Sequence, residues 1–119
     1  MSNKRTNPDF LNGVPELVVL KLLSHRPMYG YEVVQALKRT SPEALSFGEG
    51  CIYPVLHKLE AEGCLTSKQE AVNGRKRVVY RLSKPGKGKL AKAMSQWNLV
   101  VDSVNNILQG GKHVTQPSA

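Results

Sequence analysis

Between residues 48 and 63, apolar side chains recur at the spacing of one helix face. Positions i, i+3, i+4 and i+7 of this segment hold Ile52, Val55, Leu56 and Leu59. The same helix turns three polar side chains away from that face: Tyr53, His57 and Lys58. Such side chains offer a stacking surface, hydrogen bonds and positive charge, which suit a helix lying in a nucleic-acid groove. An ordinary amphipathic helix with a solvated polar face explains this segment equally well.

Two shorter helices are predicted before this segment. The first covers Val14–Ser24, where Pro15 suits an early helical position, and it is apolar on more than one face. The second runs from about Tyr29 or Gly30 to Arg39, with three residues directed inward: Val33, Val34 and Leu37. Both helices must therefore pack against other elements.

A β-hairpin is predicted after the 48–63 segment. Residues 64–70 and 76–82 alternate between apolar and polar positions, and Asn73-Gly74 between them favours the backbone angles of a tight turn. On the second strand, the alternation places Val78, Tyr80 and Leu82 on one side and Val79 on the other. Three cations directly follow the turn: Arg75, Lys76 and Arg77. A charged edge that protects the sheet is the alternative, but it does not account for their concentration at the tip.

A long helix is predicted from about Pro85 or Gly88 to Leu108, with apolar residues at alternating spacings of four and three. This heptad seam consists of Leu90, Met94, Trp97, Val101, Val104 and Leu108. One small domain cannot cover such a seam from end to end, so a second copy of the chain is the expected partner. The predicted fold is mainly α with a small β-hairpin (α+β). Residues 1–84 form one domain, residues 85–110 a dimerisation helix and residues 111–119 a disordered tail.

The charge of the chain indicates which class of molecule it binds. Its 119 residues include 17 lysines and arginines against nine acidic residues, a formal net charge of +8. From Lys68 to Lys92 there are nine basic residues and a single acidic residue, Glu70. Clustered positive charge favours a polyanion as partner. Net charge that serves only solubility requires no such clustering.

Catalytic and metal-binding chemistry is not indicated. The histidines and the two cysteines, Cys51 and Cys64, form no pattern typical of a zinc site, and no nucleophile or phosphate-binding motif is present. We therefore expect no enzyme activity and no cofactor. Without a secretory signal or an apolar run long enough to span a membrane, a reduced cytoplasmic setting is expected.

Three runs of the sequence resemble the PadR family of bacterial transcriptional regulators. They are MYGYEVVQAL at residues 28–37, GCIYPVLHKLEAEG at 50–63 and NGRKRVVYRLSKPGKGKL at 73–90. The order of three helices, hairpin and long helix is also that of a winged helix-turn-helix protein. The single long C-terminal helix looks like that of the smaller PadR subfamily, in which this helix makes the dimer.

The resemblance implies which residues meet DNA. On the third helix these are Gly50, Tyr53, Pro54, His57 and Lys58, and on the wing they are Arg75, Lys76 and Arg77. The chain departs from the family at Cys51, where a threonine or serine is common. A thiol there either senses oxidants, if its pKa is lowered, or simply fills a small buried space, which we favour.

Trp97, the only tryptophan, lies on the predicted dimer seam. The multidrug-sensing members of the small subfamily have a tryptophan in the matching place, which stacks on flat aromatic compounds. The resemblance therefore implies an effector site made by Trp97, Met94, Val101, Val104, Phe10 and Leu17. A tryptophan that merely fills the dimer core is an equally good interpretation.

These observations favour a homodimeric DNA-binding regulator, a repressor by family expectation, that acts on a palindromic operator and responds to a small aromatic ligand. The alternative is a winged-helix adaptor that docks on an acidic protein without specific DNA binding.

Overall fold

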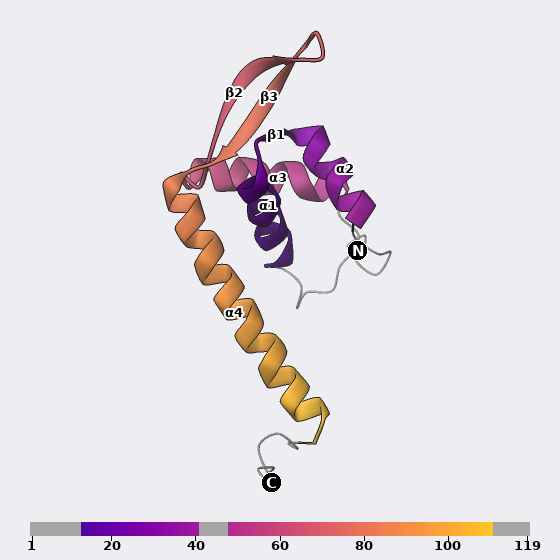
Figure 1. Ribbon diagram of the computed structural model, residues 1–119, viewed down its shortest axis with the longest axis vertical. Coiled ribbons are helices and arrows are strands. Elements are labelled where there is room, and N and C mark those ends of the chain that lie inside the picture. Colours follow the sequence, from indigo (N-terminus) through magenta and orange to yellow (C-terminus); the bar gives the residue numbers. More distant parts are fainter. Residues whose placement is uncertain (1–12, 41–47, 111–119) are drawn as a thin grey trace, which may run out of the picture.

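The three predicted helices of the N-terminal half are present in the computed structural model, which describes residues 13–40 and 48–110. Helix α1 spans Val14–His25, α2 spans Gly30–Thr40 and α3 spans Glu49–Ala61 (Figure 1). The first turn of α1 contains Pro15 and that of α2 contains Glu32, both suited to a helix start. Phe10 and the predicted tail at 111–119 lie outside the described residues.

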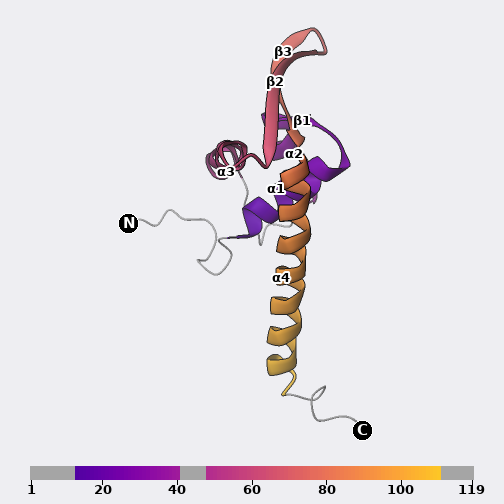
Figure 2. The same cartoon turned by 90° about the vertical axis from the view of Figure 1, so that its left-hand side faces the viewer.

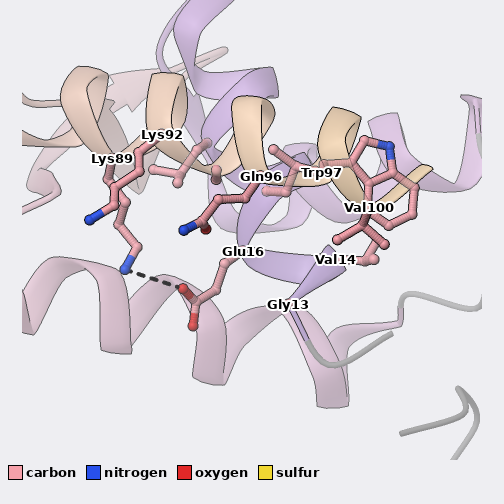
Figure 3. Close-up of a pocket in the computed structure, with 11 residues that line it drawn as sticks. Gly13, Val14, Glu16, Lys89, Lys92, Gln96, Trp97 and Val100 are labelled. Atoms are coloured by element: carbon pink, nitrogen blue, oxygen red, sulfur yellow. Dashed lines mark ion pairs between the residues drawn. The ribbon is translucent and has the colours of Figure 1, made fainter. Parts of the chain in front are cut away.

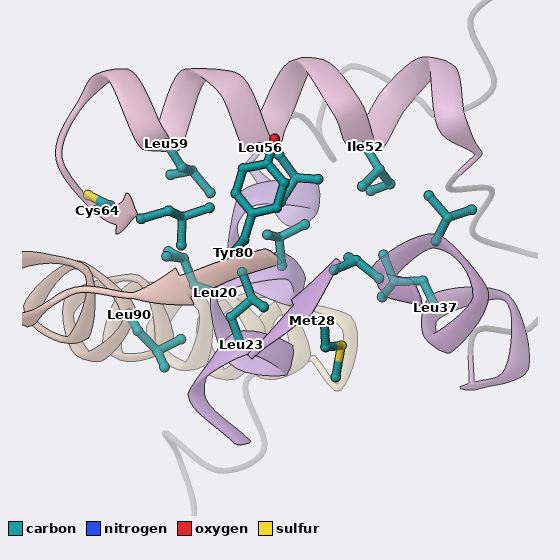
Figure 4. Close-up of a cluster of buried hydrophobic side chains, with 14 of the residues drawn as sticks. Leu20, Leu23, Met28, Leu37, Ile52, Leu56, Leu59, Cys64, Tyr80 and Leu90 are labelled. Atoms are coloured by element: carbon teal, nitrogen blue, oxygen red, sulfur yellow. The ribbon is translucent and has the colours of Figure 1, made fainter. Parts of the chain in front are cut away.

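The core lies beneath α3. Ile52, Leu56 and Leu59 are completely buried, and they point from one face of α3 toward α1 and Tyr80 (Figure 4). Helix α2 contributes Val33, Val34 and Leu37, as the sequence predicts. Since all three helices donate apolar residues to one cluster, the orientation of α3 is fixed from its buried side.

The hairpin is confirmed and extends further than predicted. Strand β2 spans Leu65–Val72 and β3 spans Arg75–Leu82, joined by Asn73 and Gly74, with φ of 52° and 78°. A two-residue strand, β1 (Met28–Tyr29), pairs antiparallel with β3 and makes a three-stranded sheet of order β1-β3-β2. The sequence did not predict β1, because two residues are too few to show an alternating pattern.

Burial does not follow the two predicted sides of β3. Val78 shares its side with the buried Tyr80 but is 42% exposed, whereas Val79, on the other side, is only 5% exposed. Val79 is buried because β3 is the central strand and β1 pairs with it at this residue. Val78 is exposed because the outer part of the hairpin projects beyond the helices (Figures 1 and 2).

Helix α4 (Lys84–Leu108) leaves the hairpin at a tight joint and extends away from the other helices (Figure 1). The Ser83 hydroxyl accepts a hydrogen bond from the Gly86 backbone N–H at 3.1 Å and donates one to the Gly63 carbonyl at 2.6 Å. The Ser83 backbone N–H donates to the Cys64 carbonyl oxygen at 3.0 Å. This joint ties the start of α4 to the end of α3, so the two helices keep a defined angle.

Most of the predicted seam of α4 is exposed. Only Leu90 is buried in the core, while Met94, Trp97, Val104 and Leu108 are exposed in the single chain. Further apolar side chains are exposed on the same helix: Leu99, Val100 and Ile107. None of the described helices is both long and apolar enough to cross a membrane.

Gly86→Ala should destabilise the protein through this joint. A Cβ atom at Gly86 would lie 2.1 Å from the Cys64 carbonyl oxygen, so the backbone at the start of α4 and that at Cys64 must move apart. We expect a decrease of roughly 1–3 kcal/mol in the free energy of unfolding, as for other overpacked sites, measured by urea denaturation followed by circular dichroism.

Gly88→Ala is the matched control, because nothing lies within 4 Å of its added Cβ. It should leave stability unchanged or raise it by up to about 1 kcal/mol through helix propensity. Equal urea midpoints for the two variants at the same protein concentration would contradict the account of the joint.

Candidate nucleic-acid interface

The exposed face of α3 is narrow and carries small side chains. At 3.6 residues per turn, the side opposite the buried leucines and isoleucine holds four exposed residues. They are Gly50, Pro54, His57 and Ala61. Three of the four were predicted, but Ala61 was missed because an exposed alanine carries no chemical signal. Because three of the four are small, another backbone can approach this face closely.

Cys51 lies beside this face and is half-buried. Burial raises the pKa of its thiol, the opposite of the lowered pKa that a reactive thiol requires. This direction favours the small-residue interpretation of Cys51 over oxidant sensing.

Tyr53 flanks the face on the side of α2. Its ring covers Gly30, where an added Cβ would lie 2.5 Å from the ring atom Cε1. Its ring centroid is 6.4 Å from that of His57, with the two planes tilted by 46°. Burial, and next the charge of Glu49, raise the pKa of Tyr53, so its hydroxyl keeps its proton at neutral pH and can donate a hydrogen bond.

The three cations of the wing separate into two kinds. Arg75 and Lys76 are exposed beside the turn, whereas the Arg77 guanidinium lies 4.6 Å from the ring centroid of Tyr29. The Arg77 Nε is buried and has no hydrogen-bond partner among the described residues. In this arrangement Arg77 connects the wing to β1 by a cation–π contact, while the other two side chains are exposed where a phosphate could approach.

Lys58 occupies the opposite flank of the face from Tyr53. Its ammonium group forms ion pairs with Glu16 on α1 and, at 3.7 Å, with Glu62 just after α3. The hydrogen bond to Glu16 is the main reason that the pKa of Lys58 is raised. Lys58, which was predicted to contact DNA, is therefore already paired with two carboxylates of its own chain.

A groove of about 490 Å³ lies between α1 and α4. Figure 3 shows Trp97 and Val100 at one end and Lys89 and Lys92 at the other. The lining residues are Gly13, Val14, Glu16, Leu17, Leu20, Lys89, Lys92, Ala93, Gln96, Trp97 and Val100.

The groove brings together two of the six predicted effector residues, Trp97 and Leu17. Met94, Val101 and Val104 are not among its lining residues, and Val100 takes part instead of Val101. The difference arises because the prediction followed the seam toward a second chain, whereas the groove faces α1 of the same chain. Within the described ranges, no group of three or more His, Cys, Asp or Glu is placed to hold a metal ion.

A helix with an exposed face, packed on two others and followed by a charged hairpin, defines a winged helix-turn-helix protein. Comparison with known proteins identifies the family of winged helix-turn-helix proteins to which the chain belongs. Residues 19–92, more than half of the chain, match the Transcriptional regulator PadR-like family. The chain belongs to this family, whose members are transcriptional regulators and not enzymes, as the sequence predicts.

Relatives match over most of the chain. Transcriptional regulator Rv3488 of Mycobacterium tuberculosis is 34% identical over 82 residues, covering 69% of this chain and 74% of the relative. An uncharacterised protein of Lysinibacillus sphaericus is 25% identical over 103 residues, covering 86% and 94%.

Solved structures of relatives share the fold. The PadR-like transcriptional regulator of Bacillus cereus is similar with a TM-score of 0.75 and 32% identity, covering 86% of this chain and 98% of that protein. Bacillus subtilis PadR in complex with operator DNA gives a TM-score of 0.62 and 27% identity, covering 68% and 46%.

Proposed function

We propose that the protein is a cytoplasmic homodimeric repressor that binds a palindromic operator and is released by a small aromatic ligand. Each subunit places the exposed face of α3 in a major groove and its wing on the adjacent backbone, with the two helices about one helical turn apart. The observation that carries the proposal is the exposed α3 face next to a wing whose Arg75 and Lys76 side chains are exposed.

DNA binding is supported by the chemistry of this surface. The face of α3 offers small residues for close approach, with the His57 ring and the Tyr53 hydroxyl for hydrogen bonds and stacking. The net charge of +8 supplies attraction to the phosphate backbone. A structural relative, Bacillus subtilis PadR, is known in complex with operator DNA.

A homodimer is supported by the apolar surface of α4. Ile107 and Leu108 are each 76% exposed, and Leu99 is 67% exposed in the single chain. Four residues of the predicted seam are exposed as well: Met94, Trp97, Val104 and Leu108. Exposed apolar side chains along one helix mark an interaction site, and a second copy of α4 offers the same heptad pattern in return.

An aromatic effector is supported by the groove between α1 and α4. Its volume of about 490 Å³ is in the usual range for small-molecule sites. Trp97, still 41% exposed, gives a flat surface for stacking. A ligand wedged between α1 and α4 would change the angle between the two subunits and hence the spacing of the recognition helices.

Arg75→Ala and Lys76→Ala should each weaken binding to every DNA sequence. Each removes a cation beside a phosphate, so the slope of log affinity against log salt concentration should fall by about 0.9 for each phosphate that the variant no longer neutralises. Fluorescence polarisation with labelled duplexes at several salt concentrations measures this.

Lys21→Ala serves as the control, because Lys21 is an exposed residue of α1 that belongs neither to the wing nor to the groove lining. It should leave the salt slope unchanged. If the Arg75 and Lys76 variants kept the salt slope of the wild type, the wing would be misassigned. If the wild-type protein bound every duplex weakly and without sequence preference, the adaptor would be favoured.

A planar aromatic cation should quench the emission of Trp97, the only tryptophan, with a saturable titration. The same compound should lower operator affinity, and operator DNA should lower the affinity for the compound by the same factor. Unchanged emission with every aromatic compound tried would favour a Trp97 that only fills the dimer core.

A further inference from the structure

Four charged side chains form a closed ring where α1, α3 and α4 meet. Lys58 pairs with Glu16 and, at 3.7 Å, with Glu62. Lys89 on α4 pairs with Glu62 at 3.4 Å and with Glu16 at 3.5 Å. Each ammonium group therefore lies between two carboxylates, and each carboxylate between two ammonium groups.

The ring supplies a second restraint beside that of the apolar core. Burial of Ile52, Leu56 and Leu59 decides which side of α3 turns outward, but hydrophobic contact is non-directional and tolerates small rotations about the helix axis. The Lys58–Glu16 contact joins residues 42 positions apart in the chain and lies on the flank of α3. It therefore resists rotation of α3 about its own axis, which decides where Gly50, Pro54 and His57 point.

Glu16, Lys58 and Lys89 keep their charges across the neutral pH range. Burial raises the pKa of Glu16, but the hydrogen bonds and charges of Lys58 and Lys89 together outweigh it, and the net pKa is lowered. Burial lowers the pKa of Lys89, but the charges of Glu16 and Glu62 outweigh it and the net pKa is raised.

Resting on the proposed DNA binding, we infer that this ring sets the rotation of the recognition helix, and that Lys58 acts as a positioning residue. Lys58 affects operator affinity through Glu16 and makes no phosphate contact of its own. The Lys58 ammonium group already pairs with two carboxylates of its own chain, so it is not available to pair with a phosphate.

The ring also borders the groove that contains Trp97. Glu16 and Lys89 belong both to the ring and to the lining of that groove (Figure 3). The same ion pairs therefore connect the space between α1 and α4 with the helix that meets DNA.

The variants needed to test this should remain folded. The side chains of Lys58 and Glu16 are 55% and 21% exposed, and an ion pair with one largely exposed partner contributes little to stability. A change in DNA binding then reflects the lost contact and not unfolding of the variant. A thermal melt of each variant checks that it remains folded.

The test is a double-mutant cycle of Lys58→Met and Glu16→Gln in the full chain, measured on an operator duplex obtained by in vitro selection. Each single variant should weaken operator binding at least a few-fold. The double variant should be no weaker than the singles, since both changes break the same contact. The salt slope of all three should equal that of the wild type.

Two controls sharpen the result. Lys58→Arg keeps the ion pairs and should bind like the wild type. Lys21→Met removes an exposed lysine of α1 that belongs neither to the ring nor to the groove lining, and it should change neither affinity nor slope.

A contact between Lys58 and phosphate gives the opposite results. Lys58→Met would then lower the salt slope by about 0.9 for each of the two Lys58 side chains in the dimer. Glu16→Gln would strengthen binding by freeing Lys58, and either result would overturn the inference. A wild-type protein without salt-dependent binding to any duplex would instead overturn the proposed function, and the inference with it.

Discussion

The burial of one face of α3 is the constraint on which the rest of the structure depends. Ile52, Leu56 and Leu59 lie in the core with no exposed surface, so at 3.6 residues per turn the opposite side must face outward. That side carries glycine, proline, histidine and alanine. A helix fixed in this way presents the same narrow surface whatever approaches it, and the joint at Ser83 and Gly86 ties its far end to α4.

Helix α4 connects this domain with a surface suited to a second chain. Its first turns belong to the core through Leu90, but most of its apolar side chains have no cover in one chain. Two copies joined along α4 would set the distance between two α3 helices, because the joint at Ser83 and Gly86 ties each α4 to its own domain. The groove lies between α1 and α4 of each chain, so a molecule bound there would change the angle between α4 and the rest of its own domain.

The sequence predicts the helices and the hairpin because their signals are local. Helical spacing defined α1 to α4, and Asn73-Gly74 defined the turn, which has positive φ at both residues. Strand β1 was missed because two residues carry no periodicity, and the burial of Val79 was missed for the same reason, since β1 pairs with β3 at this residue. The ion pairs of Lys58 depend on a residue 42 positions away and leave no local pattern.

A direct test of the proposed function is the dependence of binding on the spacing of two half-sites in one duplex. If two chains bind through α4 as a rigid dimer, sedimentation should show two chains per duplex. Insertion of about 5 base pairs between half-sites, half a helical turn, should abolish the gain in affinity over a single half-site. One chain per duplex, with affinity independent of the spacing, would contradict the account.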